Sequence, residues 1–159
     1  MALQLGVAAG YDDVFWTNVL KKVESLIEVS TDYGHIYISP KVDTTAPQSI
    51  RLWGDTSSSV TLKSTEWIKR YEVEIAIYMI SKIRSDGFYD NFFQESERVY
   101  QIMADNNVIA GSLGWFDGSV TNIEYNQLTG NEDEIDGLYK AGFNFSCLVN
   151  RTTTATIII

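Results

Sequence analysis

Glu72 and Glu74 are the residues of this 159-residue chain whose types and spacing best fit acid–base chemistry. They stand two apart in a segment with strand-like alternation, and side chains two apart on a strand project from the same face. Such a pair could act as general acid and general base, or it could form ion pairs. Because Lys69 and Arg70 are close in sequence, we expect a surface ion-pair patch.

The chain has one histidine, His35, and one cysteine, Cys147. The usual zinc sites need more such ligands, and a catalytic cysteine needs a base beside it. Cys147 alternates with Phe145 and Val149, which predicts a buried small side chain. His35 precedes a short strand, which favours a structural or surface role.

An acidic segment near the end of the chain could bind a hard cation. It lacks the alternating oxygen spacing and the closing glutamate of an EF-hand, so a solvated loop, or an acidic wall of a lumen, is the better interpretation. The glycines of 111–118 match no nucleotide-binding motif. We therefore predict no catalytic residue, no metal and no cofactor. The acidic loop or lumen candidates are Glu132, Asp133, Glu134 and Asp136.

Composition predicts one globular domain over residues 1–159, since 45% of the residues are hydrophobic and 21% are charged. The formal net charge of −9 argues against a protein that grips a nucleic-acid backbone, which needs clustered lysine and arginine. No window has the roughly 20 apolar residues of a membrane span, and no secretory signal is expected at the start of the chain.

The elements that must position these residues follow from hydrophobic periodicity. Strands together with two amphipathic helices predict an α+β fold, with a mainly antiparallel sheet and both helices packed on it. Asp86 and Gly87 are expected to form a turn, and Phe92 and Phe93 to lie on the buried face of the second helix. The strand at 49–53 should form a hairpin with the strand at 60–63. The predicted helices are 12–28 and 90–105; the predicted strands are 35–39, 49–53, 60–63, 67–82, 119–126 and a closing strand from 142.

The end of the chain is apolar and prone to form a strand. Residues 152–159 contain only threonine, alanine and isoleucine, and such an edge left bare would invite pairing with another chain. We expect an arm or strand that docks in the protein's own sheet or on a neighbouring subunit. Tryptophans at scattered positions are more often core or interface anchors than a stacking surface for a ligand. The subunit-interface candidates are Thr156, Ile157, Ile158, Ile159, Trp53, Trp67, Tyr78, Trp115 and Phe116.

The order of elements resembles the tail terminator, or tail completion, proteins of long-tailed bacteriophages. The resemblance rests on chain length and on five stretches, and it covers most of the chain as a pattern rather than a signature. The stretches are the helix start at 12–16, the turn at Trp53-Gly54, the long strand 71–78, the helix at 97–100 and the closing strand 143–149.

The resemblance implies a structural virion protein, assembled in the host bacterial cytoplasm. It would form a homo-oligomeric ring, usually of six copies, that caps the head-proximal end of the tail tube and joins it to the neck. Its partners would be the tail tube protein, the neck or head-completion protein and, further, a sheath protein. DNA would pass through without specific binding.

Three other functions remain open. Within the same biology, the chain could be a neck connector or stopper. A small-molecule or carbohydrate binding module would place Trp53, Trp115 and Phe116 around a pocket. An enzyme would have to use Glu72 and Glu74 as its acid and base.

Overall fold

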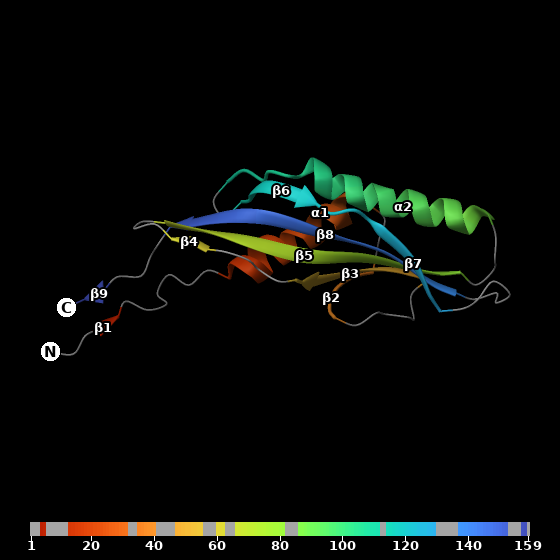
Figure 1. The fold of residues 1–159 in the computed structure, drawn as a ribbon, viewed down its shortest axis with the longest axis horizontal. Helices are drawn as coiled ribbons and strands as arrows, with labels where there is room; N and C mark the ends of the chain where they lie inside the picture. The colour runs from red at the N-terminus through yellow and green to blue at the C-terminus, as the bar shows by residue number, and fades with distance from the viewer. Residues whose placement is uncertain are drawn as a thin grey trace.

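The protein is an α+β structure in which one sheet carries helices on one face (Figure 1). The computed structural model describes residues 4–5, 13–31, 35–40, 47–55, 60–62, 66–81, 86–111, 114–129, 137–152 and 157–158. Its elements in chain order are β1 (Gln4–Leu5), the π-helix η1 (Val14–Leu20), α1 (Lys21–Ser30), β2 (Ile36–Ile38), β3 (Gln48–Gly54), β4 (Val60–Leu62), β5 (Glu66–Ser81), α2 (Asp86–Asp105), β6 (Phe116–Val120), β7 (Glu124–Thr129), β8 (Gly137–Thr152) and β9 (Ile157–Ile158).

The main sheet is built on β5 and β8, two antiparallel strands of 16 residues each that run side by side along the body (Figure 1). They pair from Glu66 with Thr152 to Ser81 with Gly137. Seven strands form this sheet in the order β2-β3-β5-β8-β6, with β4 added to β5 and β7 to β8. Among the described strands of this sheet, β2 and β3 are the one parallel pair. The predicted mainly antiparallel α+β fold is confirmed.

One face of the sheet forms the core with the helices. The ring of Phe15 in η1 stacks on Tyr71 of β5 at a centroid distance of 5.3 Å, and Tyr100 of α2 meets Phe143 of β8 at 5.1 Å. In β8, every second residue from 141 to 149 is buried, which agrees with the alternation predicted for the closing strand. The core-facing residues of β3, β5 and β8 include Ile50, Leu52, Val73, Ile75, Ile77, Phe143, Phe145, Cys147 and Val149.

The first helix starts as predicted, where the Asp13 side chain accepts a hydrogen bond from the Trp16 backbone N–H. Its first part, however, is a π-helix rather than an α-helix. The N–H of Lys21 bonds back to the carbonyl of Trp16, five residues earlier. Val14 and Val19 are five apart and both buried, and this wider turn allows both of them to face the core.

The predicted hairpin between 49–53 and 60–63 is wrong, because β3 and β4 both pair with β5. β3 runs along the second half of β5, and β4 along its beginning, where Val60 lies opposite Lys69. The N–H of Asp55, just after β3, still donates to the Glu72 carbonyl at 2.9 Å. Since β5 is more than twice as long as β3, one edge of it holds both strands.

Two further boundaries differ from prediction. The segment predicted as one strand at 119–126 contains the end of β6 and the start of β7, which both pair with β8. The helix α2 begins at Asp86, so Asp86 and Gly87 lie in its first turn rather than in a separate turn. An acidic residue is favourable at a helix N-terminus, because it meets unpaired N–H groups and the positive end of the helix dipole.

The two ends of the described chain pair with each other outside the main sheet. β1 and β9 form a separate two-stranded antiparallel sheet, in which Gln4 lies opposite Ile158 and Leu5 opposite Ile157. This pair, here called the terminal ribbon, stands at one end of the molecule next to both termini (Figure 1). The strand at the chain end therefore pairs within its own chain, with the N-terminal strand rather than with the main sheet.

Candidate functional site

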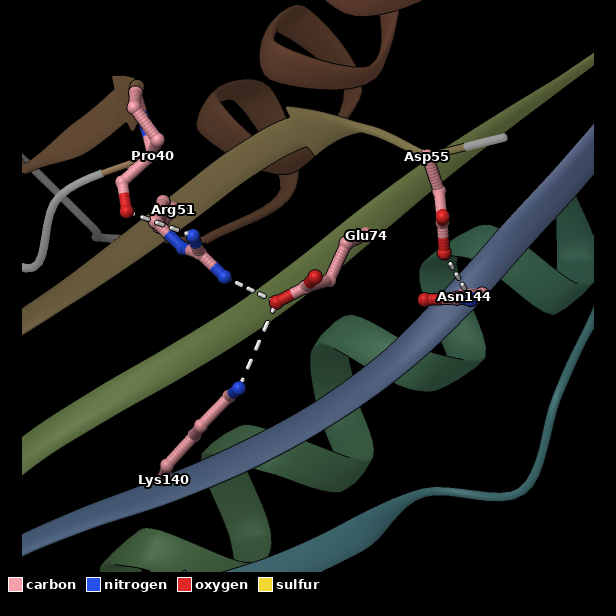
Figure 2. A network of polar contacts seen from close by, with 6 residues as sticks. All are labelled: Pro40, Arg51, Asp55, Glu74, Lys140 and Asn144. Atoms are coloured by element: carbon pink, nitrogen blue, oxygen red, sulfur yellow. Dashed lines mark hydrogen bonds and ion pairs between the residues drawn. The ribbon is translucent and has the colours of Figure 1, made fainter. Parts of the chain in front are cut away.

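The face of the sheet opposite the helices carries charged and polar side chains and is called the open face. It includes Arg51 and Trp53 of β3, Glu72 and Glu74 of β5, and Lys140 and Asn144 of β8. The Glu74 carboxylate lies between two cations, the guanidinium of Arg51 and the ammonium of Lys140, whose Nζ is 3.5 Å from Glu74 Oε1 (Figure 2). Arg51 also donates to the Pro40 carbonyl at 3.0 Å. The predicted ion pairing of Glu74 is confirmed, although its partners come from other strands.

Glu72 belongs to a second network on the open face. The amide of Asn144 donates at 2.9 Å to the Glu72 carboxylate and also at 2.9 Å to the carboxylate of Asp55. Figure 2 shows the second of these bonds, which joins the end of β3 to β8. Glu72 and Glu74 thus share one face, as predicted, but each is held by donors from β8.

Arg70 and Lys69 contact groups other than the two glutamates. Arg70 donates to Asp117 of β6 at 2.9 Å and to the hydroxyl of Ser146 at 3.3 Å. The Lys69 ammonium lies 4.8 Å from the ring centre of Tyr71. The prediction that Lys69 and Arg70 pair with the two glutamates is therefore wrong. Strand pairing places residues of β3 and β8 closer to the glutamates than their sequence neighbours.

A hollow of about 470 Å³ lies on the open face where β6 gives way to β7. Its lining is mostly polar, and it is open to solvent on one side. Because the Glu74 carboxylate already pairs with two cations, it is not an unpaired charge that a ligand in the hollow could bind. It is lined by Glu74, Thr121, Asn122, Glu124, Asn126, Lys140, Gly142, Phe143 and Asn144.

The single cysteine is buried as predicted, with no exposed surface. Burial raises the pKa of the Cys147 thiol to about 12, against a smaller lowering by Arg70 and Lys22. A thiol with that pKa is protonated at neutral pH and is a poor nucleophile. His35 is exposed, and its Nδ1 lies 3.3 Å from the hydroxyl of Tyr37.

Within the described residues, no group of three histidine, cysteine or acidic side chains is placed to hold a metal ion. In that same part of the chain, no helix is long and apolar enough to cross a membrane.

Three of the predicted interface aromatics reach the surface. Trp53 on the open face is 42% exposed, and Phe116 at the start of β6 is 37% exposed. Trp67 is half-buried, with the guanidinium of Arg151 5.9 Å from its ring centre.

Two other interface candidates are buried. Trp115 is 1% exposed, packs on Phe145, and donates its indole N–H to the Asn106 carbonyl at 2.9 Å. Tyr78 is 4% exposed, with the Lys140 ammonium 5.9 Å from its ring centre. Trp115 therefore stabilises the core and cannot line a shared surface pocket with Trp53 and Phe116.

Of the remaining candidates, Ile157 and Ile158 form β9 of the terminal ribbon. Thr156 and Ile159 lie outside the described residues, as do the acidic candidates Glu132, Asp133, Glu134 and Asp136.

The structure also shows two exposed aromatic rings in contact with each other, which the sequence did not predict. Phe93 of α2 and Tyr125 of β7 form a T-shaped contact at 4.9 Å, with 47% and 39% of their surfaces exposed. Phe92, the neighbour of Phe93, is 2% exposed. The prediction that both phenylalanines are buried is wrong for Phe93, because successive helical residues point about 100° apart. We call Phe93 and Tyr125 the aromatic patch.

Comparisons with known proteins give structural likeness only. Neither a scan against protein families nor a search of curated proteins finds a match. A chain in a structure described as the virion of a native gene transfer agent particle aligns over 86% of this chain and 91% of its own, with a TM-score of 0.45 and 8% identity. A second solved structure, without a functional description, aligns over 87% and 96%, with a TM-score of 0.48 and 13% identity. At these values neither similarity assigns a function.

Proposed function

We propose that this chain is a structural protein of a phage-like virion, and specifically a tail terminator that forms a ring on the head-proximal end of the tail tube. The proposal starts from the order of elements that resembles this family. The structural observation that supports it is the terminal ribbon, in which β1 and β9 pair outside the main sheet.

A ribbon of two short strands is at most marginally stable in water. Residues 157–159 are all isoleucine, and the residue opposite Ile157 is Leu5. A sequence this apolar and prone to form a strand is stabilised when another surface covers it. Because the ribbon lies at one end of the body (Figure 1), a second subunit is well placed to provide that surface. This supports an assembly of identical chains.

The open face supports the second part of the proposal. Several of its charged side chains are joined in networks across β3, β5 and β8, so these charges are largely compensated within the subunit. The chain as a whole has a net charge of −9. A ring of such subunits would repel the DNA backbone and let DNA pass without binding it.

In this proposal the ring binds the tail tube protein on one side and a neck or head-completion protein on the other, with a sheath protein as a further partner in contractile tails. The assembled protein would be found in the virion, at the junction of tail and neck. No cofactor and no catalytic step is involved.

Native mass measurement and electron microscopy of the purified protein test the proposal. We expect a closed oligomer, present alone or on addition of tail tubes, and rings seated on one end of the tubes. A chain that remains monomeric at its highest soluble concentration and does not bind tube ends would exclude a tail terminator.

A further inference from the structure

The hollow on the open face has a glycine at its floor. Gly142 of β8 lies opposite Ala76 of β5 on one side and opposite Glu124 of β7 on the other. Because two small residues lie side by side here, the sheet surface is low between the longer side chains of Lys140 and Asn144. A Cβ added at Gly142 would lie 3.3 Å from Lys140 Cε. The volume of about 470 Å³ is that of a small-molecule site, which typically measures about 300–1,000 Å³.

Two side chains on the inner wall of the hollow are already held in place. The amide nitrogen of Asn144 donates to Asp55 and Glu72, both at 2.9 Å, which leaves its Oδ1 to accept. The Lys140 ammonium lies 3.5 Å from Glu74 Oε1 and has further N–H groups to donate (Figure 2). Groups that are fixed in advance lose little conformational freedom when a ligand binds.

The outer wall of the hollow carries polar groups without partners. Asn122, Glu124 and Asn126 stand at alternate positions, are exposed, and line the hollow. Ile123, between the first two, packs against the core instead. Within the part of the chain that the structure describes, none of these three polar side chains has a hydrogen bond or an ion pair. An amide offers both donors and an acceptor, and a carboxylate accepts. The wall therefore presents both kinds of group to solvent.

The charges at the hollow balance. Glu74 and Glu124 contribute two negative charges. Lys140 and Arg51 contribute two positive charges, and both of them contact Glu74. A charged ligand of either sign therefore gains little net attraction. An apolar ligand would remove water from the amides without replacing their hydrogen bonds, which costs free energy. The lining favours a neutral, polar ligand.

A sugar matches such a lining. Each of its hydroxyl groups donates and accepts, so it pairs with an amide, a carboxylate or an ammonium. The C–H faces of a sugar ring are apolar and pack on aromatic rings. One such ring is near the hollow, because Trp53 of β3 lies opposite Glu74 and is 42% exposed. It is one strand, about 4.8 Å, beyond Glu74, within reach of a short oligosaccharide.

We propose that the hollow binds a neutral carbohydrate. One sugar ring lies over Gly142, with its hydroxyls bonded to Asn144 on the inner wall and to Asn126 on the outer wall. The next ring of the ligand packs on Trp53, one of the aromatic residues that the sequence placed at a pocket. The site lies on the main sheet, apart from the terminal ribbon, and does not depend on the proposed function.

Isothermal titration calorimetry tests the site with maltotriose, cellotriose and triacetylchitotriose as neutral probes. We expect at least one of them to bind with a dissociation constant of about 1 mM or lower. Glucuronic acid and glucosamine are the charged probes and should bind more weakly than any neutral probe that binds. The proposal is overturned if no neutral probe binds at about 10 mM, or if a charged probe binds best.

Gly142→Val fills the floor of the hollow without removing any of its polar groups. It should raise the dissociation constant of the sugar at least about tenfold, because the new side chain occupies the place of the ligand. A β-branched residue suits a strand, and circular dichroism checks the fold. Ser146→Val, on the same face of β8 but outside the hollow, is the matched control and should bind as the wild type does.

Two further variants separate the contacts. Asn126→Ala should raise the dissociation constant about fivefold, as expected for one lost hydrogen bond. Trp53→Ala should weaken the binding of a trisaccharide but not of a monosaccharide. If Gly142→Val folds and still binds the sugar as tightly as the wild type, the sugar binds elsewhere and this site is wrong.

Discussion

Arg51 of β3 and Glu74 of β5 form an ion pair across the open face of the sheet, and Lys140 of β8 reaches the same carboxylate. Only 13% of the Arg51 side chain is exposed, and its Nε is buried without a hydrogen-bond partner. Glu74 is thus the group that compensates a largely buried cation. Through these two contacts Glu74 links β3, β5 and β8.

Glu74→Ala should lower the free energy of unfolding by about 1–3 kcal/mol, because it leaves the Arg51 guanidinium without its carboxylate in a partly buried place. Urea unfolding followed by circular dichroism measures this. Glu124→Ala, an exposed residue near the same hollow, is the control and should change stability by less than about 0.5 kcal/mol. Equal effects of the two substitutions would mean that the ion pair contributes nothing.

Neighbouring phenylalanines on α2 should behave differently. Phe92→Ala should cost about 3–5 kcal/mol, since its ring is 2% exposed and its loss leaves a cavity among other rings. Phe93→Ala should cost less than about 1.5 kcal/mol, because 47% of that side chain is already in contact with water. Thermal or urea unfolding of both variants compares them, and a larger loss for Phe93 would contradict the orientation of α2.

Cys147 should react with thiol reagents at pH 8 only after unfolding, because burial raises its pKa from 9.0 to about 12. The raised pKa also predicts a pH dependence. The folded state holds the proton more tightly, so this contribution is fully present below pH 9 and is lost as pH rises from 9 toward 12. The difference in unfolding free energy between wild type and Cys147→Ala should shrink over that window. Fast labelling of the native protein would contradict the buried position.

Removing residues 153–159 should weaken assembly more than folding. Thr152 is still part of β8 and pairs with Glu66, whereas β9, among the described strands, pairs with β1 and not with the main sheet. The truncated chain should therefore keep nearly the same urea midpoint while its oligomer dissociates at higher protein concentration. Native mass spectrometry over a dilution series makes the comparison. A large drop in the midpoint would show that the ribbon stabilises its own subunit instead.

Much of the fold was readable from alternation. The buried face of β8 and the extent of β5 follow from apolar residues at every second position, a pattern that depends on the local chain alone. The assignment of β3 and β4 to a hairpin failed, because two short strands can also share one edge of a long strand. Nothing in their own residues distinguishes these pairings.

The open face was only partly predictable. That Glu72 and Glu74 share a face follows from their spacing, but their partners do not. Arg51 is 23 positions from Glu74, and Asn144 is 72 positions from Glu72, so only strand pairing brings them together.

The amino-acid sequence was enough to predict the fold class, the buried side of the long strands, the burial of Cys147 and an apolar chain end in need of a partner. Each of these depends on residue type and local period. The tertiary structure decided where that end lies. It pairs β9 with β1 at one end of the body and exposes Phe93 and Tyr125 toward the other. Such positions depend on contacts between residues far apart in the chain, which no local pattern encodes.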